Sequence, residues 1–190
     1  MWKQVSNSIR MLVLFTILLG FIYPLGMVGI AQALFPGQAG GSIIMHQGVP
    51  VGSRLIGQTF TSPAYFYSRP SAAGEGYDGA NSSGSNLGPT NQKLMAAVAE
   101  RAETARQDNG AAQSAKVPAD LVLASASGLD PHITPAAAYF QADRVAQARG
   151  LTSQQVHQLV GSHIEKKQLG FLGEERVNVL LLNVALDNLH

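Results

Sequence analysis

A run of 25 residues without a charged side chain, residues 11–35, constrains the fold of this chain more than any other feature of its sequence. As an α-helix the run would reach about 37 Å, whereas crossing the hydrocarbon core of a bilayer takes about 30 Å. Lys3 and Arg10 precede the run, and no acidic residue does. The positive-inside rule therefore predicts a cytosolic amino terminus at residues 1–10, a transmembrane helix at 11–35 and an extracytoplasmic domain at 36–190.

The same run leaves a second interpretation open. Ala31-Gln32-Ala33 has the small-x-small form of a signal-peptide cleavage site. The apolar stretch is longer than the roughly 7–15 residues of a signal-peptide core, which favours a retained anchor. Within it, Pro24 removes a backbone donor and predicts a kink at Gly20. Gly29 and Ala33 lie four residues apart, so a second helix could approach closely in lipid.

The composition excludes several classes of function. The net charge is +1 and no basic run is interleaved with aromatic residues, so nucleic acid is not an expected partner. The chain has no cysteine, which excludes disulfides, thiolate metal sites and a cysteine nucleophile. With 46% hydrophobic and 13% charged residues, the part after the apolar run is expected to fold as one globular domain.

The exported part carries the local signals of both strands and helices. Short β-like stretches are indicated at residues 43–45, in VPV and RLIG around a Gln47-Gly48 turn, and in LVLAS at 121–125, which is typical of a buried strand. Helices are indicated at 91–108, from Thr134-Pro135 to Gly150, and after Thr152, where Gln155 completes a capping box. Asn178 is expected to cap a fourth helix through Leu189, although RVNVL also suits a strand. The predicted fold class is α+β, with one transmembrane helix ahead of a single mixed domain.

The glycine-rich tract GEGYDGANSSGSNLGPTN, residues 74–91, is the first candidate for chemistry. It lacks the Lys-Ser/Thr ending of a P-loop and the G-x-G-x-x-G spacing of a dinucleotide site, so a phosphate cradle is disfavoured. Gly, Ser and Asn at this density more often fix an irregular loop by positive φ angles and side-chain hydrogen bonds.

Two further sets of residues are weak candidates for a catalytic or metal site. Asp130 and His132 lie near Ser125, as in a hydrolytic triad, but no G-x-S-x-G elbow surrounds that serine. His157 and His163 are six residues apart, which is not the spacing of two zinc ligands on one helix. We therefore expect no catalytic residue, no bound cofactor and no metal site of its own.

Five stretches, in order along the chain, are similar to the signature motifs of one protein family. They are YFYSRP at 65–70, GSNLGPTN at 84–91, ASGLDPHITPAAA at 126–138, RVAQARG at 144–150 and RVNVLLLNVALD at 176–187. With the amino-terminal span, the similarity covers nearly the whole chain, and five motifs in a fixed order are a specific signal. The chain resembles KdpC, the C subunit of the Kdp potassium-transporting P-type ATPase.

The resemblance implies a non-catalytic accessory subunit of a high-affinity, ATP-driven potassium import complex in a bacterial inner membrane. Besides membrane lipid, its partners would be a channel-like subunit that translocates potassium and a P-type ATPase subunit that hydrolyses ATP. ATP and potassium are then handled by these partners. The family is also described as a catalytic chaperone that raises the ATP affinity of the ATPase subunit. Because ATP is cytosolic and residues 36–190 are placed outside, we expect that effect to be indirect.

The apolar run and the motifs supply candidate contacts with the partner subunits. These are Gly29, Ala33, Tyr65, Arg69, Ser85, Asn86, Asn91, Asp130, His132, Asn178 and Asn183. The glycine-rich tract is expected to hold Asn86 and Asn91 toward the subunit that receives the ion. The alternatives are a membrane-anchored periplasmic hydrolase that uses Ser125 or His132, and a free-standing binding protein with a ligand pocket.

Overall fold

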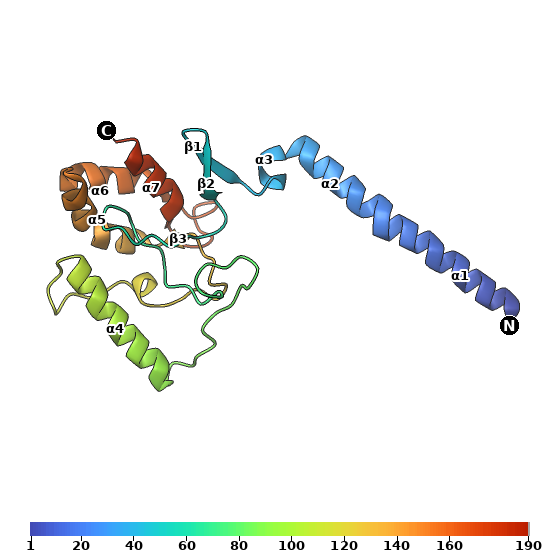
Figure 1. Cartoon of the computed structure of the whole chain (residues 1–190), viewed down its shortest axis with the longest axis horizontal. Coiled ribbons are helices and arrows are strands. Elements are labelled where there is room, and N and C mark those ends of the chain that lie inside the picture. Colours follow the sequence, from blue (N-terminus) through green and yellow to red (C-terminus); the bar gives the residue numbers. More distant parts are fainter. Residues whose placement is uncertain (190) are drawn as a thin grey trace. The chain divides into compact units, whose positions relative to one another are not determined.

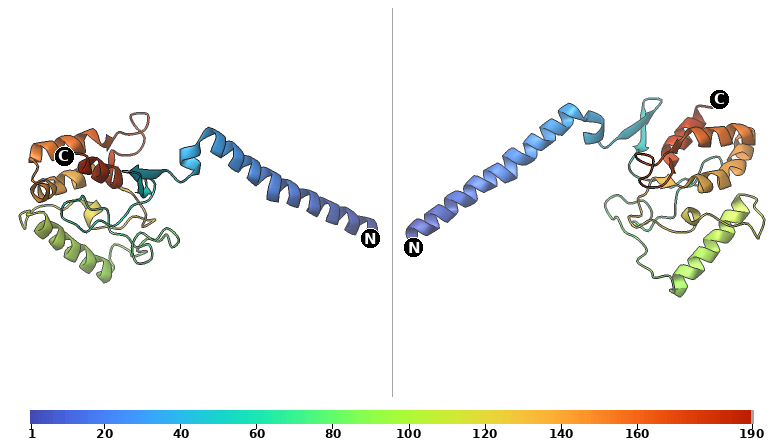
Figure 2. Two further views of the ribbon diagram at one scale, coloured as in Figure 1. Left: turned by 45° about the horizontal axis from the view of Figure 1, so that its top comes forward. Right: turned by 180° about the vertical axis from the view of Figure 1, so that it is seen from behind.

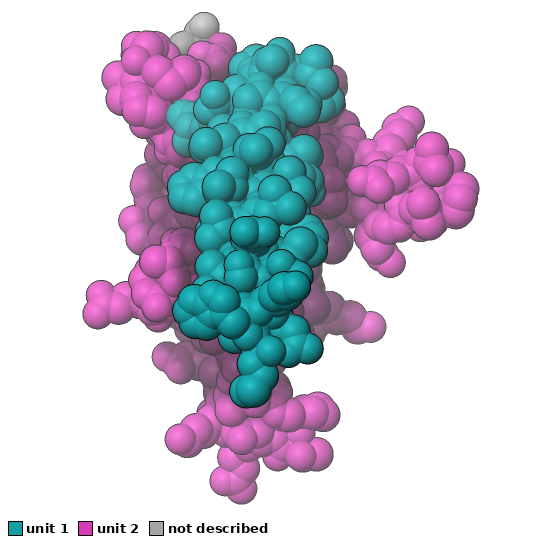
Figure 3. Space-filling model, turned by 90° about the vertical axis from the view of Figure 1, so that its right-hand side faces the viewer, with its two compact units in different colours: residues 1–43 teal, residues 44–190 magenta. Residues whose placement is uncertain are grey.

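A computed structural model describes residues 1–189 of the chain, and Figure 1 shows the order of its elements. The chain divides into two compact units, residues 1–43 and the part from Ile44 onward, which are drawn in different colours in Figure 3. An N-terminal apolar helix followed by a mixed helix and sheet domain confirms the predicted α+β class.

The first unit is almost entirely helical. It consists of α1 (Trp2–Ile17), a π-helical turn η1 (Leu18–Ile22), α2 (Tyr23–Leu34) and the short α3 (Pro36–Ala39). The stretch Trp2–Leu34 is long and apolar enough to cross a membrane, and its apolar window is exposed. The helix begins nine residues before the predicted span, because residues 2–10, which include Lys3 and Arg10, are helical as well.

Pro24 disturbs the helix in the predicted place. Proline has no N–H, so the carbonyl of Gly20 lacks its usual donor four residues later. The hydrogen bonding widens there to the π-helical turn Leu18–Ile22, and a Cβ on Gly20 would lie 3.9 Å from the Thr16 side chain of the preceding turn. Helix irregularities of this kind are expected where the regular bonding pattern is interrupted.

The second unit combines two small antiparallel sheets with four helices. A hairpin of β1 (Ile43–His46) and β2 (Val49–Ser53) comes first, and the other sheet has the order β3-β5-β4. Its strands are β3 (His132–Ile133), β4 (Ile164–Glu165) and β5 (Arg176–Asn178). The helices are α4 (Gln92–Asp108), α5 (Pro135–Arg149), α6 (Ser153–Ser162) and α7 (Val179–Asp187), with a 3₁₀ turn η2 at Ala119–Leu121.

The helix boundaries follow the capping signals of the sequence. Asn91 caps α4, and Thr134 caps α5 ahead of Pro135 at its first position. Gly150 ends α5 in the left-handed region with φ 68°, which glycine adopts without strain. The capping box of Thr152 and Gln155 at the start of α6 is complete. These predictions are confirmed because each depends only on residues within one turn of the helix end.

Two predictions about strands were wrong, and a third differs only at its boundary. LVLAS is not a strand, since Ala119–Leu121 forms a 3₁₀ turn after Pro118 and no strand pairs with the residues that follow. RLIG lies in a turn after β2, with Leu55 61% exposed. RVNVL contains both of the elements considered for it: its first three residues form β5, and Asn178 caps α7 as predicted, although this helix ends at Asp187 rather than at Leu189.

The hydrophobic core of this unit lies between α5, α6, α7 and the β3-β5-β4 sheet, which gather on one side of the domain in Figure 1. Its buried members are Phe66, Ile133, Ala137, Ala138, Ala142, Val145, Ala146, Val156, Val160, Val177, Val179, Leu182 and Leu186. Helix α4 contributes no fully buried residue. Leu94, Val98, Ala102 and Ala105, on one face of α4, are only half-buried, so this helix packs at the edge of the domain.

Phe66 belongs to this core although it comes from the long segment between β2 and α4, and a polar side chain holds it in place. Oδ1 of Asn183 accepts a hydrogen bond from Phe66 N at 2.9 Å, and Nδ2 of the same amide donates to Phe66 O at 3.0 Å. Asn183 is 2% exposed. Its amide thereby satisfies two backbone groups that no strand pairs.

Asn183→Ala should lower the free energy of unfolding by about 2–4 kcal/mol, because it leaves the buried N–H and C=O of Phe66 without partners. Chemical denaturation of the full chain in mild detergent, followed by near-UV circular dichroism, measures this. Asn188→Ala is the matched control, since Asn188 is exposed at the end of the same helix and its side-chain amide donates to Val184 O of that helix. The control should change stability by about 0.5 kcal/mol or less. Equal effects of the two changes would contradict the assigned role of Asn183.

Candidate functional site

The glycine-rich tract is fixed to the segment that precedes β3. Ser83 N donates to Ser127 O at 3.0 Å, and the Ser82 hydroxyl donates to the same carbonyl at 2.9 Å. A Cβ on Gly128, where φ is 67°, would stand 2.5 Å from Ser83 O. Glycine is required here because two backbones approach closely and one of them has a left-handed conformation. The tract is an ordered loop, as its composition predicts.

The exposed end of this loop leads into α4. Ser85, Asn86 and Leu87 are exposed, and Asn86 has a φ of 52°. Asparagine tolerates this left-handed conformation better than most residues. Asn91 is also exposed, but its Oδ1 accepts from Lys93 N at 2.9 Å as the cap of α4. The loop thus presents Ser85 and Asn86 to solvent, while Asn91 both faces solvent and fixes the helix.

A charged cluster lies beside the loop, around Arg69. The Arg69 guanidinium is 3.4 Å from Asp120 and 3.3 Å from Asp130. Asp130 Oδ1 accepts a hydrogen bond from His132 N at 3.0 Å and lies 3.3 Å from His132 Nδ1. With residues 174–176, these side chains line a hollow of about 230 Å³. The predicted candidates Arg69, Asp130 and His132 are therefore neighbours in one half-buried site.

The carboxyl group of Asp130 is held in its ionised form. Burial acts to raise its pKa, but hydrogen bonds from the side chain and backbone of His132 and the charge of Arg69 together lower it below the ordinary value of 3.8. Nearby, burial raises the pKa of Tyr77 to about 12, and its hydroxyl donates to Arg69 O at 2.6 Å. The cluster is therefore an ion-pair site and not a base poised near neutral pH.

A second set of charges continues the cluster through His132. His132 Nε2 is 3.9 Å from Glu165, which pairs with Arg54 and Arg176 at 3.0 Å each. Burial acts to raise the pKa of Glu165, but the hydrogen bonds from the two arginines lower it overall. His132 therefore joins two carboxylates, one in the loop before β3 and one in β4.

The remaining predicted contacts within this unit have partners inside the domain. The Tyr65 hydroxyl donates to Asp187 Oδ2 at 3.2 Å, and Asp187 also pairs with Arg149 at 2.6 Å. Asn178 is 2% exposed, caps α7 through Leu181 N and donates to Arg54 O. Asn183 is bonded to Phe66 as described above. Burial of the two asparagines assigns them structural roles, in contrast to the exposed Ser85 and Asn86. Gly29 and Ala33 lie exposed in α2 of the other unit.

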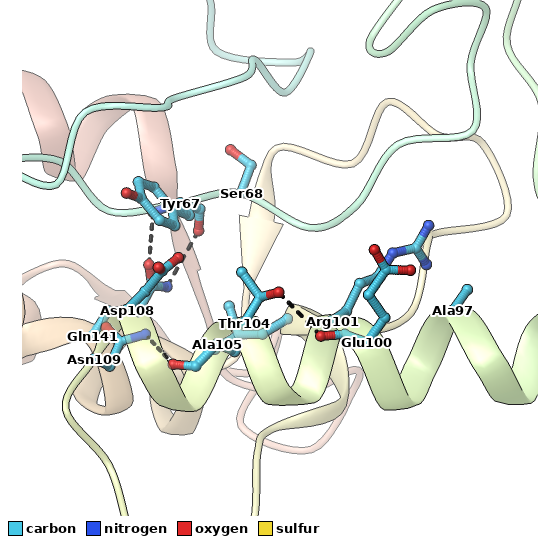
Figure 4. A pocket seen from close by; sticks show the side chains of 11 residues that line it. Tyr67, Ser68, Ala97, Glu100, Arg101, Thr104, Ala105, Asp108, Asn109 and Gln141 are labelled. Carbon is cyan, nitrogen blue, oxygen red and sulfur yellow. Dashed lines mark hydrogen bonds between the residues drawn. The ribbon is translucent and has the colours of Figure 1, made fainter.

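One hollow of the domain was not predicted from the sequence. A cavity of about 390 Å³ lies between α4 and the segment Tyr67–Ser68 (Figure 4). Gln141 at its base accepts from Tyr67 N at 2.7 Å and donates to Tyr67 O at 3.2 Å. Arg144 lies over the Tyr67 ring at 4.0 Å. The sequence signal that could have indicated this cavity is the pair of polar residues Gln141 and Arg144 on the otherwise apolar inner face of α5.

The weak catalytic and metal candidates are not assembled into such sites in the described residues. Ser125 Oγ accepts from Gly128 N at 2.9 Å and lies 3.4 Å from Ser127 Oγ, whereas His132 faces the two carboxylates. His157 lies 3.8 Å from Asp143, and His163 bonds to Leu159 O. Within residues 1–189, no group of three His, Asp or Glu side chains is arranged to hold a metal ion.

Comparison with known proteins identifies relatives over the full length. The model of the KdpC family, described as K⁺-transporting ATPase, c chain, matches residues 5–188. The potassium-transporting ATPase KdpC subunit of Koribacter versatilis is 53% identical over 187 residues, which are 98% of this chain and 95% of the relative. The subunit of the same name from Mycobacterium tuberculosis is 50% identical over 189 residues, or 100% of both chains. That of Acidobacterium capsulatum is 54% identical over 188 residues, 97% of this chain and all of the relative.

Asp130 should make the stability of the domain depend on pH in acid. Its pKa is lower in the folded chain than the ordinary value of 3.8, so its stabilising contribution is complete above that value and is lost as the pH falls through the folded pKa. Asp130→Asn keeps an acceptor for His132 N but has no charge to lose. Urea midpoints of the full chain in detergent, measured from about pH 6 downward, should therefore fall less steeply below about pH 4 in the variant than in the wild type. Parallel curves would contradict the ion-pair role.

Proposed function

Because the chain belongs to the KdpC family, the c chain of K⁺-transporting ATPases, we propose that it is a non-catalytic accessory subunit that assembles and stabilises a high-affinity potassium import complex. The full-length similarity carries this proposal, since it includes the apolar helix as well as the domain. The relatives are named as subunits of a potassium-transporting ATPase. The partners that we propose are a potassium-translocating, channel-like subunit and a P-type ATPase subunit, which handle potassium and ATP.

The proposed topology places the stretch Trp2–Leu34 in the bacterial inner membrane, with the amino terminus in the cytosol and the domain outside. The length and apolar character of the helix support the anchor, and Lys3 and Arg10 support the orientation. On this topology the domain does not meet cytosolic ATP. Any increase in the ATP affinity of the ATPase subunit then acts indirectly, through the contacts that this chain makes with its partners.

The proposed docking surface of the domain is the exposed end of the glycine-rich loop, with Ser85, Asn86 and Asn91. Its support is that the loop is fixed by hydrogen bonds to Ser127 and yet leaves these polar side chains in solvent. An ordered loop loses little conformational entropy on binding. In the membrane, Gly29 and Ala33 are the proposed contacts with a partner helix. Apart from its chain neighbours and the nearby backbone of its own helix, a Cβ on Gly29 would meet no atom of the described residues within 4 Å.

The topology is tested with single cysteines, since the natural chain has none. Ser114 is exposed in the segment after α4, and Ser8 is exposed near the amino terminus. Ser114→Cys should react with a membrane-impermeant maleimide on intact spheroplasts, and the control Ser8→Cys should react only after lysis. The opposite pattern would reverse the orientation and make direct contact of the domain with ATP feasible.

The docking loop is tested with Asn86→Gly, because glycine tolerates the φ of 52° at this position and alanine does not. The stability of the chain should change by about 0.5 kcal/mol or less, since the side chain is exposed. Loss of interface hydrogen bonds worth about 1–2 kcal/mol should reduce the affinity for the companion subunits by roughly 5–30-fold. Affinity is measured by titrating the tagged chain into membranes that contain the other subunits. Ser114→Gly, an equally small change remote from the loop, is the control. Wild-type affinity of the Asn86 variant would remove this loop from the interface.

A further inference from the structure

The loop between β4 and β5 exposes apolar side chains to an unusual degree. Leu169 is 83% exposed and Phe171 72%, the highest values among the large hydrophobic residues described after residue 43, and Leu172 is 48% exposed. Single exposed apolar residues are common on protein surfaces, but three within four positions form a patch. None of these three side chains belongs to the hydrophobic core or to the charged cluster around Arg69.

The backbone of this loop is ordered around the patch. Gln168 and Leu172 exchange two hydrogen bonds of 2.9 Å each, and Phe171 N donates to Gln168 O at 3.2 Å. Leu169 has a φ of 52°, which is rare for a bulky residue, and Gly170 follows with 82°. Backbone strain of this kind is kept where it holds side chains in a particular position. The loop thus displays Leu169 and Phe171 on a closed, hydrogen-bonded turn.

Charges bracket the apolar tip on both sides along the chain. Residues 168–173 carry no charge, whereas Lys166 and Lys167 precede them and residues 174–176 are Glu, Glu and Arg. At a bilayer surface, zwitterionic headgroups lie above an apolar acyl region. An apolar tip between stems that carry both signs of charge matches this order of charged and apolar layers. The acyl region can accept the tip while the zwitterionic headgroups accept cationic and anionic side chains.

The tether keeps the domain within reach of such a surface. Helix α2 ends at Leu34 and β1 begins at Ile43, so the connection spans at most about 30 Å even if fully extended. A domain of this size has a radius of gyration of roughly 15 Å. The β1–β2 hairpin, which follows the tether, exposes Met45 and Val49 at 56% and 61%. Arg54, just after this hairpin, pairs with Glu165 at the base of the β4–β5 loop at 3.0 Å. The apolar loop is therefore a neighbour of the first element after the tether.

We propose that the β4–β5 loop inserts Leu169, Phe171 and Leu172 into the surface of the same bilayer that holds the N-terminal helix. This inference rests on the membrane anchor of the proposed function. It gives the domain a second attachment to the membrane, which restrains its rotation about the tether. A protein groove would need a shape complementary to the tip, whereas a fluid acyl region accepts a projecting apolar turn without one.

The test uses tryptophan as a depth probe in the full chain, incorporated into phosphatidylcholine nanodiscs. Trp2 is the single tryptophan of the chain, so Trp2→Phe provides a silent background. Phe171→Trp then places the probe at the tip. The matched control is Met95→Trp, at a residue that is 60% exposed on α4, which lies away from the β4–β5 loop in the views of Figures 1 and 2. Phosphatidylcholine brominated near the headgroup should reduce the emission of the tip probe by about half or more and leave the control nearly unchanged.

Each other outcome overturns the inference. Equal or absent quenching of the two probes, in chains with wild-type thermal midpoints, would show that the loop does not enter lipid. Unquenched emission of the tip probe that becomes shielded from aqueous iodide only in the assembled complex would assign the loop to a partner subunit. Absence of the chain from the nanodisc fraction on size exclusion would instead refute the anchor itself, which separates failure of the proposed function from failure of the loop.

Discussion

The fold of the domain depends on side chains of α5 and α7 that hydrogen-bond the backbone of residues 63–67. Gln141 and Asn183 each pair with both the N–H and the C=O of one residue, Tyr67 and Phe66 respectively. Arg144 and Arg149 donate to the carbonyls of residues 63 and 64. These bonds replace a missing strand partner, because buried backbone groups must be satisfied. They hold a segment without regular secondary structure against the helical core.

The candidate interaction site is built on this attachment. The same segment leads directly to Arg69, whose ion pairs with Asp120 and Asp130 join it to the loop before β3. That loop in turn binds the glycine-rich tract through Ser127. A continuous series of contacts therefore links the core helices to Ser85 and Asn86. Because of these contacts, an irregular loop can present polar side chains in a fixed position. This arrangement suits the accessory role that we propose for the chain.

The sequence allowed prediction of the features that depend on neighbouring residues. The apolar helix, the caps at Asn91, Thr134 and Thr152 and the stop at Gly150 all have local causes, and all are present. The prediction of a strand at LVLAS was wrong because an apolar stretch forms a strand only where another strand pairs with it. Gln141 and Arg144 were missed because they bind backbone groups more than 70 positions away in the sequence. Their polarity on an otherwise apolar helix face does not indicate which segment they contact. Asn178 and Asn183 were singled out by a motif, but only the fold shows that both are buried and bonded within the domain.

The assignment of the chain as an accessory subunit is tested by isolating it from its native membrane through a terminal tag in mild detergent and measuring ATP hydrolysis of the isolated material. It predicts that two companion membrane subunits co-purify, that the isolated complex hydrolyses ATP with stimulation by potassium, and that the chain stripped of its companions has no such activity. Isolation of the chain alone from membranes that contain the companions, or ATP hydrolysis by the chain alone, would contradict its assignment as a non-catalytic accessory subunit.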